Sequence, residues 1–282
     1  TGVQTCALPT LDNSKSLPLL RTEPIVSIVT ATYNRAHFLR EFIESIEGQT
    51  YPHWEAVIVD NNSEDETKEL VEAFKERHPG KVNYIRLSDN LGFTPAVEEG
   101  IRCSSGELLM FMGDDDLIMP KLLTLSVKEF KRNPDLGLVY TNLWYGERPE
   151  EKQYFQDSYS GVNDRKLEPE EFLDMKKRGK SICAQAAVFR KDVYEMLGGF
   201  TDYYMQDTEF FFRISTQYEI AYIPQPLAFS REHEGMFTKD KYEEFAEARP
   251  HTCAGCVCVV CKEKPVIKRH EVWGDILLCE DH

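Results

Sequence analysis

Residues 108–116 decide the fold, and they read Leu-Leu-Met-Phe-Met-Gly-Asp-Asp-Asp. The first five residues are a continuous apolar run, which predicts a strand buried on both faces of a sheet. Three carboxylates follow that run after a single glycine, Gly113. We therefore expect a buried strand that brings an acidic cluster to one edge of a sheet.

Four further apolar runs surround this strand in the chain, and helical patterns separate them. The runs cover residues 25–30, 54–59, 82–87 and 136–141. Strands that alternate with helices predict an α/β fold with a mostly parallel, Rossmann-like sheet flanked by helices. Such sheets bind ligands at the carboxyl ends of their strands. Two polar pairs also stand at those ends, so we expect one crevice there: Tyr33-Asn34 and Asp60-Asn61.

Local signals predict where several elements begin and end. Ser63 with Glu66 has the spacing of a capping box that opens a helix. Pro95 is expected at the first position of the next helix, where its missing N–H costs nothing. A late strand is predicted at residues 220–223, and the polar segment 147–165 is expected to form a mobile loop.

The acidic triplet has a specific chemical meaning. Adjacent carboxylates repel one another and raise each other's pKa values unless a cation is near. Hard oxygen ligands suit Mg²⁺ or Mn²⁺, and such an ion is typically held by one or two carboxylates together with substrate phosphates. The alternative is a solvated acidic turn in which Asp116 caps a helix.

The composition excludes several classes of protein. The chain has 282 residues, of which 41% are hydrophobic, and its net charge is −15. An excess of acidic residues argues against binding to nucleic acid or to anionic lipid, because phosphates attract Lys and Arg. No apolar run reaches the roughly 20 residues that a membrane span needs. We expect a cytoplasmic protein with, at most, peripheral contact at the inner membrane face.

Several motifs in one order carry a resemblance to a known family. They lie at residues 28–35, 59–63, 106–116, 198–200 and 206–210. Together these motifs resemble glycosyltransferase family 2, which has the GT-A fold and inverting chemistry. The likeness runs from about residue 24 to about residue 233, and we assign the GT-A domain to residues 23–248. The motifs' order and predicted context make a chance match implausible.

The resemblance implies a nucleotide site and a divalent metal site. Residues that match the family's nucleotide pocket are Ala31, Tyr33, Asp60, Asn61 and Asp114. Tyr33 is implied near the base, and Asp60 with Asn61 at the uracil or ribose. The implied ligands of Mn²⁺ or Mg²⁺ are Asp115, Asp116 and His233.

The catalytic base implied by the resemblance is Asp207, which matches the acidic residue of the family's Glu-Asp motif. A carboxylate there would deprotonate the acceptor hydroxyl. Taken alone, Asp207 is more typical of a helix N-cap. The chain departs from the family pattern at several positions, which leave its base preference and activity open: Asn61, Val97-Glu98, Gly113 and Gln206.

The last residues of the chain predict a small structural zinc site. The expected ligands are Cys258, Cys261, Cys279 and His282, with Cys253 and Cys256 as additional candidates. Paired cysteines at this spacing are typical of zinc ribbons, and zinc binding folds segments that are too small for a core. We assign this tail to residues 249–282 and expect it to contact a protein partner; the alternative is a disordered, reducible tail. Residues 1–22 lack periodicity and are expected to be non-native or disordered.

These observations favour a metal-dependent, inverting glycosyltransferase. Its expected donor is a nucleotide-diphosphate sugar, in first place a UDP-sugar, and its expected acceptor is a carbohydrate or lipid-linked hydroxyl in polysaccharide or glycolipid synthesis. Two alternatives stay open: a catalytically degenerate scaffold with a zinc interaction module, and a nucleotidyltransferase. The latter would want a glycine-rich, basic phosphate loop after the first strand, and residues 31–35 do not supply one.

Overall fold

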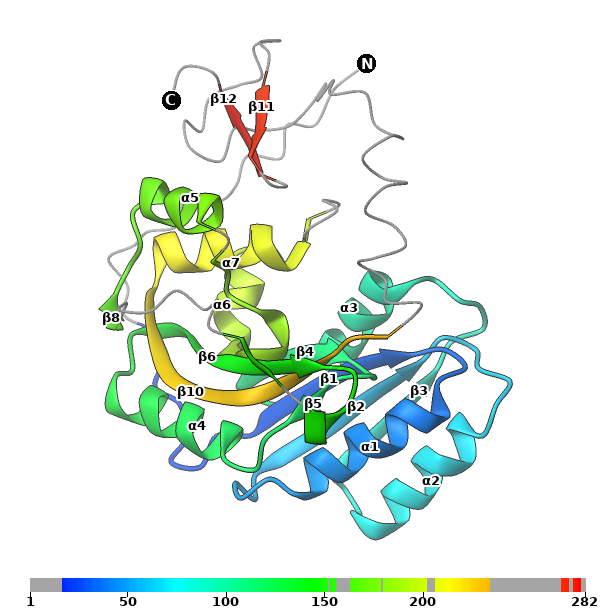
Figure 1. The fold of residues 1–282 in the computed structure, drawn as a ribbon. Helices are drawn as coiled ribbons and strands as arrows, with labels where there is room; N and C mark the ends of the chain where they lie inside the picture. Colours follow the sequence, from blue (N-terminus) through cyan, green and yellow to red (C-terminus); the bar gives the residue numbers. More distant parts are fainter. Residues whose placement is uncertain are drawn as a thin grey trace, which may run out of the picture.

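The computed structural model describes residues 17–151, 153–155, 163–178, 180–201, 206–233, 270–273 and 276–279. In these residues a single ten-stranded sheet forms the centre of the molecule (Figure 1). Its strands are β1 Val26–Thr32, β2 Trp54–Asp60, β3 Val82–Arg86, β4 Leu108–Gly113, β5 Leu117–Ile118, β6 Leu136–Gly146, β7 Gln153–Phe155, β8 Asn163–Arg165, β9 Ala187–Arg190 and β10 Glu219–Arg231.

The N-terminal half of the sheet is parallel and aligns the strand ends that matter for function. Strands β3, β2, β1 and β4 are neighbours in that order, and all three pairings are parallel. The register sets Thr32 opposite Asp60 and Ala31 opposite Gly113. The carboxyl ends of β1, β2 and β4 therefore lie side by side, as the sequence predicts.

The sheet is mixed, so the expectation of a mostly parallel sheet is wrong. Strand β9 lies between β4 and β6 and is antiparallel to both. The pairings of β5 and β8 with β10, and of β7 with β6, are also antiparallel. Apolar runs reveal that a strand is buried but not its direction, which depends on the length and path of the connections.

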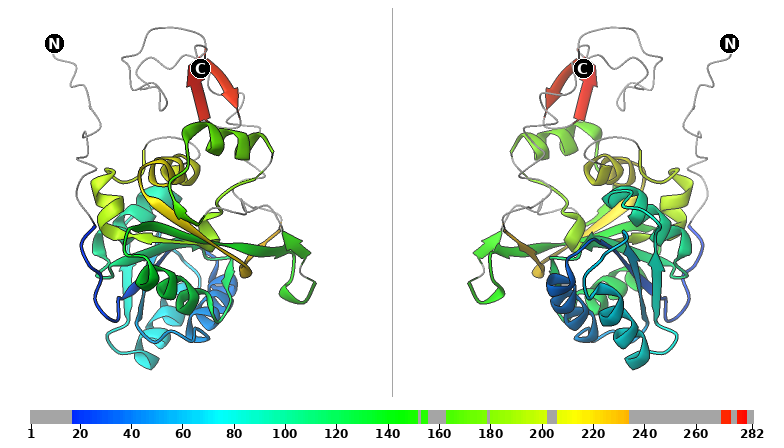
Figure 2. Two further views of the ribbon diagram at one scale, coloured as in Figure 1. Left: turned by 90° about the vertical axis from the view of Figure 1, so that its left-hand side faces the viewer. Right: turned by 90° about the vertical axis from the view of Figure 1, so that its right-hand side faces the viewer.

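Helices cover both faces of the sheet and divide the core into two layers (Figure 2). They are α1 Ala36–Glu47, α2 Thr67–Arg77, α3 Phe93–Cys103, α4 Leu122–Arg132, α5 Pro169–Lys177, α6 Lys191–Met196 and α7 Gln206–Gln217. Helices α1, α2 and α4 pack on one face, and α3, α5, α6 and α7 pack on the other. In β1, Ile28 belongs to the first layer and Val29 to the second, which is the alternation that a strand requires.

Several predicted boundaries are wrong for local reasons. Strand β10 continues beyond Ile223 to Arg231, because register shifts near Pro226 allow it to pass a proline-containing segment. Ser63 does not cap α2; its hydroxyl instead accepts a hydrogen bond from the Asn34 N–H at 2.9 Å. Pro95 is the third residue of α3 rather than the first. Within the segment expected to be a loop, the structure also forms β7 and β8.

The predicted zinc tail is described only in part. Strands β11 His270–Trp273 and β12 Ile276–Cys279 form an antiparallel pair, separate from the large sheet. Of the predicted zinc ligands, Cys279 ends β12, and the others lie outside the described residues: Cys253, Cys256, Cys258, Cys261 and His282. The zinc site and the domain boundaries stay predictions. Among the described helices, all fall short of the length or apolarity required to cross a bilayer.

Candidate functional site

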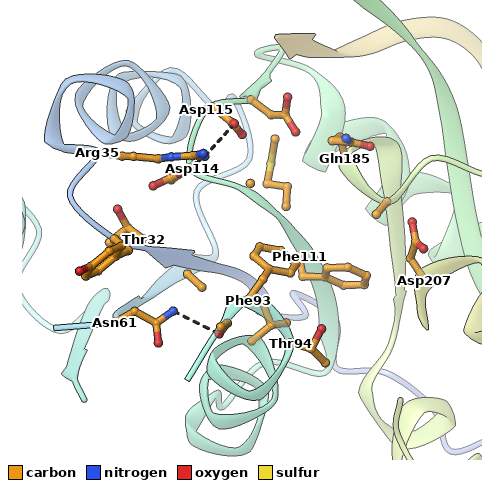
Figure 3. Close-up of a pocket in the computed structure, with 18 of the residues that line it drawn as sticks. Thr32, Arg35, Asn61, Phe93, Thr94, Phe111, Asp114, Asp115, Gln185 and Asp207 are labelled. Atoms are coloured by element: carbon orange, nitrogen blue, oxygen red, sulfur yellow. Dashed lines mark hydrogen bonds and ion pairs between the residues drawn. The ribbon is translucent and has the colours of Figure 1, made fainter. Parts of the chain in front are cut away.

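A cavity of about 780 Å³ opens at the carboxyl ends of β1, β2 and β4 (Figure 3). The residues before α3 form one wall, and residues near β9, β10 and α7 form the wall opposite. Most of the residues predicted for the nucleotide, the divalent metal and catalysis line this cavity, namely Ala31, Tyr33, Asn61, Asp114, Asp115, Asp116 and Asp207. The structure thus brings together residues that lie up to 176 positions apart in the chain, from Ala31 to Asp207.

Asp114 and Asp115 form the acidic wall, and they share one cationic partner. Arg35, the residue before α1, places its Nη1 atom 3.0 Å from Asp115 Oδ2 and 3.4 Å from Asp114 Oδ1. The Arg35 side chain is 33% exposed, whereas that of Asp114 is 4% exposed. The cation therefore reaches the buried carboxylates from the solvent side of the cavity.

One oxygen of the Asp114 carboxylate forms no hydrogen bond to the described residues. That atom, Oδ2, is buried. Burial raises the pKa of Asp114 to about 6, and the charge of Asp115 adds to that rise. The Thr32 hydroxyl lowers this pKa from nearby but does not reach hydrogen-bond geometry. A buried carboxylate oxygen without a donor is costly unless a cation or a bound molecule satisfies it. The residues present therefore fit a divalent cation at Asp114 and Asp115.

Within the described residues, no group of three His, Cys, Asp or Glu side chains is placed to hold a metal ion. Two carboxylates alone would leave most of the coordination sphere open. That is the arrangement typical of Mg²⁺ and Mn²⁺ sites in which substrate phosphates supply further oxygens.

Asp116, predicted as a metal ligand, is tied to the end of β10, and its role as a ligand stays a prediction. Its Oδ1 accepts a hydrogen bond from the Arg231 N–H at 2.9 Å, which ties the end of β10 to the acidic loop. Burial raises the pKa of Asp116 well above its usual range, and the charge of Asp115 raises it further. The Arg231 guanidinium also reaches Asp115 O at 2.9 Å and Glu41 at 2.6 Å.

His233, expected as a metal ligand, contacts the acidic wall directly. Its Nε2 lies 2.8 Å from Asp115 Oδ2, the same oxygen that Arg35 approaches. Its ring packs against Phe38 of α1, with ring centroids 4.8 Å apart. Whether His233 binds a metal stays a prediction, but the structure does place it beside the predicted ligand Asp115.

Asp207 stands across the cavity from the acidic wall. It is the second residue of α7, so it is not the N-cap of that helix. One of its oxygens, Oδ1, accepts a hydrogen bond from the Thr208 N–H at 2.7 Å. Figure 3 shows Asp207 and Gln185 on the side of the cavity that faces Asp114 and Asp115. The space between the two walls is available to a substrate.

Three exposed hydrophobic side chains form an apolar patch on the cavity. Tyr33 is 45% exposed, Leu91 57% and Phe93 38%, and all three line the cavity. Exposed apolar groups gathered at one site are typical of ligand contact. An aromatic ring next to a nucleotide site can stack on a base.

Asn61 holds one part of this patch in place. Its Oδ1 accepts a hydrogen bond from the Leu91 N–H, and its Nδ2 donates to Gly92 O, both at 3.2 Å (Figure 3). Gly92 has a φ of 86°, a conformation that L residues with a side chain rarely adopt. Asn61 therefore fixes the turn that leads into α3.

Asp60, like His233, is a predicted site residue that does not line the cavity. It is fully buried, and its carboxylate accepts hydrogen bonds from the Ser63 N–H at 2.7 Å and from the Tyr84 hydroxyl at 2.6 Å. Arg86 lies 3.3 Å from the same carboxylate. These contacts show Asp60 ordering the loop that presents Asn61.

Three residues that line the cavity were not predicted from the sequence, namely Arg35, Gln185 and Leu91. Arg35 stands in the first family motif, but nothing in its spacing marks it as a partner of Asp114 and Asp115. Gln185 and Leu91 lie in segments without a motif. Only the polar, glycine-containing stretch after β3 could have drawn attention to the turn at Leu91.

Comparisons with known proteins identify the family and support the fold. A family model described as Glycosyl transferase family 2 matches residues 27–198. The poly-beta-1,6-N-acetyl-D-glucosamine synthase of Staphylococcus epidermidis is 32% identical over 117 residues. That match covers 42% of this chain and only 28% of the relative, so the chain spans a small part of that protein's length.

Two solved structures share the fold. Staphylococcus aureus TarS 1–349 in complex with UDP-GlcNAc has a TM-score of 0.62 at 17% identity, covering 76% of this chain and 60% of TarS 1–349. A mannosyltransferase from Pyrobaculum calidifontis, in complex with GDP-Man and Mn²⁺, has a TM-score of 0.57 at 22% identity. That match covers 78% of this chain and 60% of the mannosyltransferase. At this level of identity the likeness establishes the fold alone.

Proposed function

This chain belongs to glycosyl transferase family 2, and we propose that it is a metal-dependent, inverting glycosyltransferase. The donor that we propose is a nucleotide-diphosphate sugar, in first place a UDP-sugar. The proposed acceptor is a hydroxyl group of a carbohydrate or of a lipid-linked glycan, in polysaccharide or glycolipid synthesis. The UDP-GlcNAc bound to TarS and the polysaccharide named for the Staphylococcus epidermidis relative support these classes of donor and product.

The cavity has carboxylates on two facing sides, and this observation supports the proposal most strongly. Asp114 and Asp115 line one wall of the cavity, and Asp207 lines the wall across from them (Figure 3). Sugar transfer needs a site for the leaving diphosphate on one side of the anomeric carbon and a base for the acceptor hydroxyl on the other. A cavity with these two sides, at the ends of parallel strands, has that arrangement.

Asp207 is the proposed general base. It takes the proton of the acceptor hydroxyl while that oxygen forms a bond to the anomeric carbon. The bond from the anomeric carbon to the diphosphate breaks in the same step, and the nucleotide diphosphate leaves. Attack from the face opposite the leaving group inverts the anomeric configuration, because no enzyme carboxylate intervenes as a nucleophile.

Asp114 and Asp115 are the proposed ligands of a divalent cation, with Asp116 holding the loop that bears them. A bound Mn²⁺ or Mg²⁺ supplies Lewis-acid stabilisation of the charge that develops on the diphosphate. The apolar patch of Tyr33, Leu91 and Phe93 is the proposed contact for the nucleobase. Aromatic stacking contributes about 1–3 kcal/mol per base in other nucleic-acid sites.

The direct test is the release of nucleoside diphosphate from a panel of UDP- and GDP-sugars, with a panel of glycan acceptors and with or without Mn²⁺. Wild-type protein should turn over at least one donor, and chelation of the metal should abolish that turnover. Asp207→Asn should lower kcat by roughly 100- to 10,000-fold, which is the usual contribution of a general base. Its affinity for UDP should stay unchanged.

The same assays can also identify a degenerate scaffold or a nucleotidyltransferase. No turnover with any donor, combined with intact nucleotide binding, would favour a degenerate scaffold. Release of pyrophosphate from a nucleoside triphosphate would favour a nucleotidyltransferase. Full turnover in Asp207→Asn would remove the assignment of the base without removing the family's activity.

We also propose that residues 249–282 bind a structural zinc ion. Four ligands, namely Cys258, Cys261, Cys279 and His282, would close a tetrahedral site with a structural or partner-binding role. Metal analysis of protein purified under reducing conditions should find about one zinc ion per chain. A content near zero would reject the site.

A further inference from the structure

One guanidinium nitrogen stands between the two carboxylates that we assign to the divalent cation. Arg35 Nη1 lies 3.0 Å from Asp115 Oδ2 and 3.4 Å from Asp114 Oδ1. His233 Nε2 approaches the same Asp115 oxygen at 2.8 Å. Two side chains that can carry positive charge therefore face the acidic wall.

Gly113 makes this arrangement possible. A Cβ atom at that position would collide with Asp115 Oδ1, because the Asp115 carboxylate folds back over the glycine. The chain has glycine where the family pattern usually has an aspartate. The Asp115 carboxylate occupies the space that a side chain at position 113 would fill. Its other oxygen, Oδ2, contacts Arg35 and His233.

The unused Oδ2 of Asp114 shows that Arg35 does not satisfy the wall completely. This atom is buried without a hydrogen-bond partner, although Oδ1 of the same carboxylate faces Arg35. The site consequently has the capacity to take up another cation. That cation and Arg35 would compete for the same two carboxylates, since like charges repel at short range.

We propose that Arg35 is a positioning residue that couples the binding of the divalent cation to the binding of the sugar-nucleotide donor. The inference rests on the proposed function, because it takes the diphosphate of the donor as the second partner of Arg35. Without nucleotide, Arg35 pairs with Asp114 and Asp115 and weakens cation binding. With nucleotide, the diphosphate offers the guanidinium an anionic partner, and the two carboxylates become available.

The chemistry and exposure of Arg35 suit this exchange. A guanidinium forms planar, paired hydrogen bonds with phosphate as readily as with carboxylate. With 33% of its side chain exposed, Arg35 has room to change partners without unpacking the core. Its place immediately before α1 keeps it at the mouth of the cavity.

Coupling of this kind has a measurable signature, because it is reciprocal between the two ligands. Titration of Mn²⁺, followed by the electron paramagnetic resonance signal of the free ion, gives the affinity with and without saturating UDP. In wild-type protein, UDP should tighten Mn²⁺ binding strongly. In Arg35→Gln, Mn²⁺ should bind roughly tenfold more tightly than to wild type without UDP, and the gain from UDP should shrink.

Two further variants separate charge from structure. Arg35→Lys retains the positive charge, so without UDP it should bind Mn²⁺ within about threefold of wild type. Lysine cannot form the paired hydrogen bonds of a guanidinium, so the gain from UDP should be smaller than in wild type. Arg40→Gln removes an exposed arginine of α1 that does not line the cavity, and it should behave as wild type. Arg35→Met is a second charge-removing variant if the glutamine variant folds poorly by circular dichroism.

The outcomes distinguish this inference from the function on which it rests. If Arg35→Gln and Arg35→Met bind Mn²⁺ no more tightly than wild type without UDP, while UDP still tightens Mn²⁺ binding to wild type, the role of Arg35 is wrong and the proposed function stands. If neither UDP nor GDP binds, alone or with Mn²⁺, both proposals fail. An equal gain from UDP in wild type and in Arg35→Gln would also overturn the coupling.

Discussion

The acidic wall contains a buried, charged carboxylate, which can bind a cation but lowers the stability of the fold. Asp114 is almost completely buried, and one of its oxygens has no hydrogen-bond donor in the described residues. Binding sites often keep such groups, at the expense of stability, because a ligand later satisfies them. Asp60, by contrast, is equally buried but fully provided with donors from Ser63, Tyr84 and Arg86.

Replacement of Asp114 by asparagine should therefore stabilise the free protein and weaken the site. Asparagine has nearly the same shape but no charge to bury, so we expect the melting temperature at pH 7.5 to rise by about 2–4 °C, which corresponds to about 1 kcal/mol in a chain of this size. The affinity for UDP in the presence of Mn²⁺ should fall at least tenfold. Asp135→Asn, at an exposed loop position, is the matched control and should change neither quantity. A lower melting temperature for Asp114→Asn would show that Asp114 is satisfied in the free protein.

The turn before α3 depends on one side chain from the end of β2. Asn61 accepts a hydrogen bond from the Leu91 N–H and donates one to Gly92 O, so an amide suits both partners. A carboxylate can accept the first bond but cannot donate the second. The departure from the family's usual aspartate thus has a structural reason at this position.

Asn61→Asp should open this turn and weaken nucleotide binding. A carboxylate facing Gly92 O is repelled, so the amide protons of residues 91–93 should exchange faster with solvent. UDP affinity should fall roughly 5- to 30-fold, equal to about 1–2 kcal/mol, while Mn²⁺ affinity without UDP stays the same. Asn83→Asp is a suitable control, because Asn83 also donates to a carbonyl, that of Cys103, but does not line the cavity. Unchanged UDP affinity in Asn61→Asp would separate the turn from nucleotide binding.

Helix α3 packs unusually close to the sheet, and Gly100 sets the distance. A Cβ at Gly100 would lie 2.5 Å from Val29 Cγ1 and 3.0 Å from Val59 Cγ2, both on fully buried strand residues. Gly100→Ala should therefore cost about 1–3 kcal/mol from overpacking, despite the better helix propensity of alanine. Gly48→Ala is the control, since its Cβ would meet only ordinary contacts at 3.5 Å and beyond. Urea denaturation checks both; a stability of Gly100→Ala equal to that of wild type would contradict the packing.

Sequence patterns predicted the parallel half of this fold and the common edge at which Tyr33, Asn61 and Asp114 meet. Each of those strands is a short apolar run that is followed by a polar group. The run indicates a buried strand, and the polar group indicates where that strand ends. The run at residues 186–190 also predicts a strand, which is β9, but its antiparallel direction left no signal, because strand direction has no counterpart in local composition. Nothing in the sequence indicated that Asn61 and not Asp60 lines the cavity, since both residues are polar, adjacent and buried.

Across the whole chain, acid stability should depend on carboxylates that tie distant segments together. Glu55 on β2 accepts hydrogen bonds from the Ser27 hydroxyl at 2.6 Å and from the Ser105 hydroxyl at 2.7 Å, and also from the Gly106 N–H. Burial by itself raises the pKa of Glu55, but these donors outweigh burial and hold the pKa below its usual value. A lowered folded-state pKa means that the ionised carboxylate stabilises the fold.

Because the folded-state pKa of Glu55 is lowered, this carboxylate stabilises the fold more at neutral pH than at acidic pH. The contribution of Glu55 is present above the unfolded pKa of about 4.3 and is lost as the pH falls through the lower folded value. Glu55→Gln should be less stable than wild type by about 1 kcal/mol at pH 7, and the difference should shrink below about pH 4. Urea denaturation between pH 3 and pH 7 measures it, with Glu72→Gln on the exposed side of α2 as the control. A difference that does not depend on pH would contradict the account.

The most direct test of the central claim is a crystal structure of the protein with UDP and Mn²⁺. We predict an anomalous manganese peak roughly 2.1 Å from a carboxylate oxygen of Asp114 or Asp115, which is a usual length for a bond between such an ion and oxygen. The diphosphate should contact the ion, and the uracil should lie against Tyr33. A manganese peak remote from both carboxylates, or nucleotide density outside the cavity between Asp115 and Asp207, would contradict the claim.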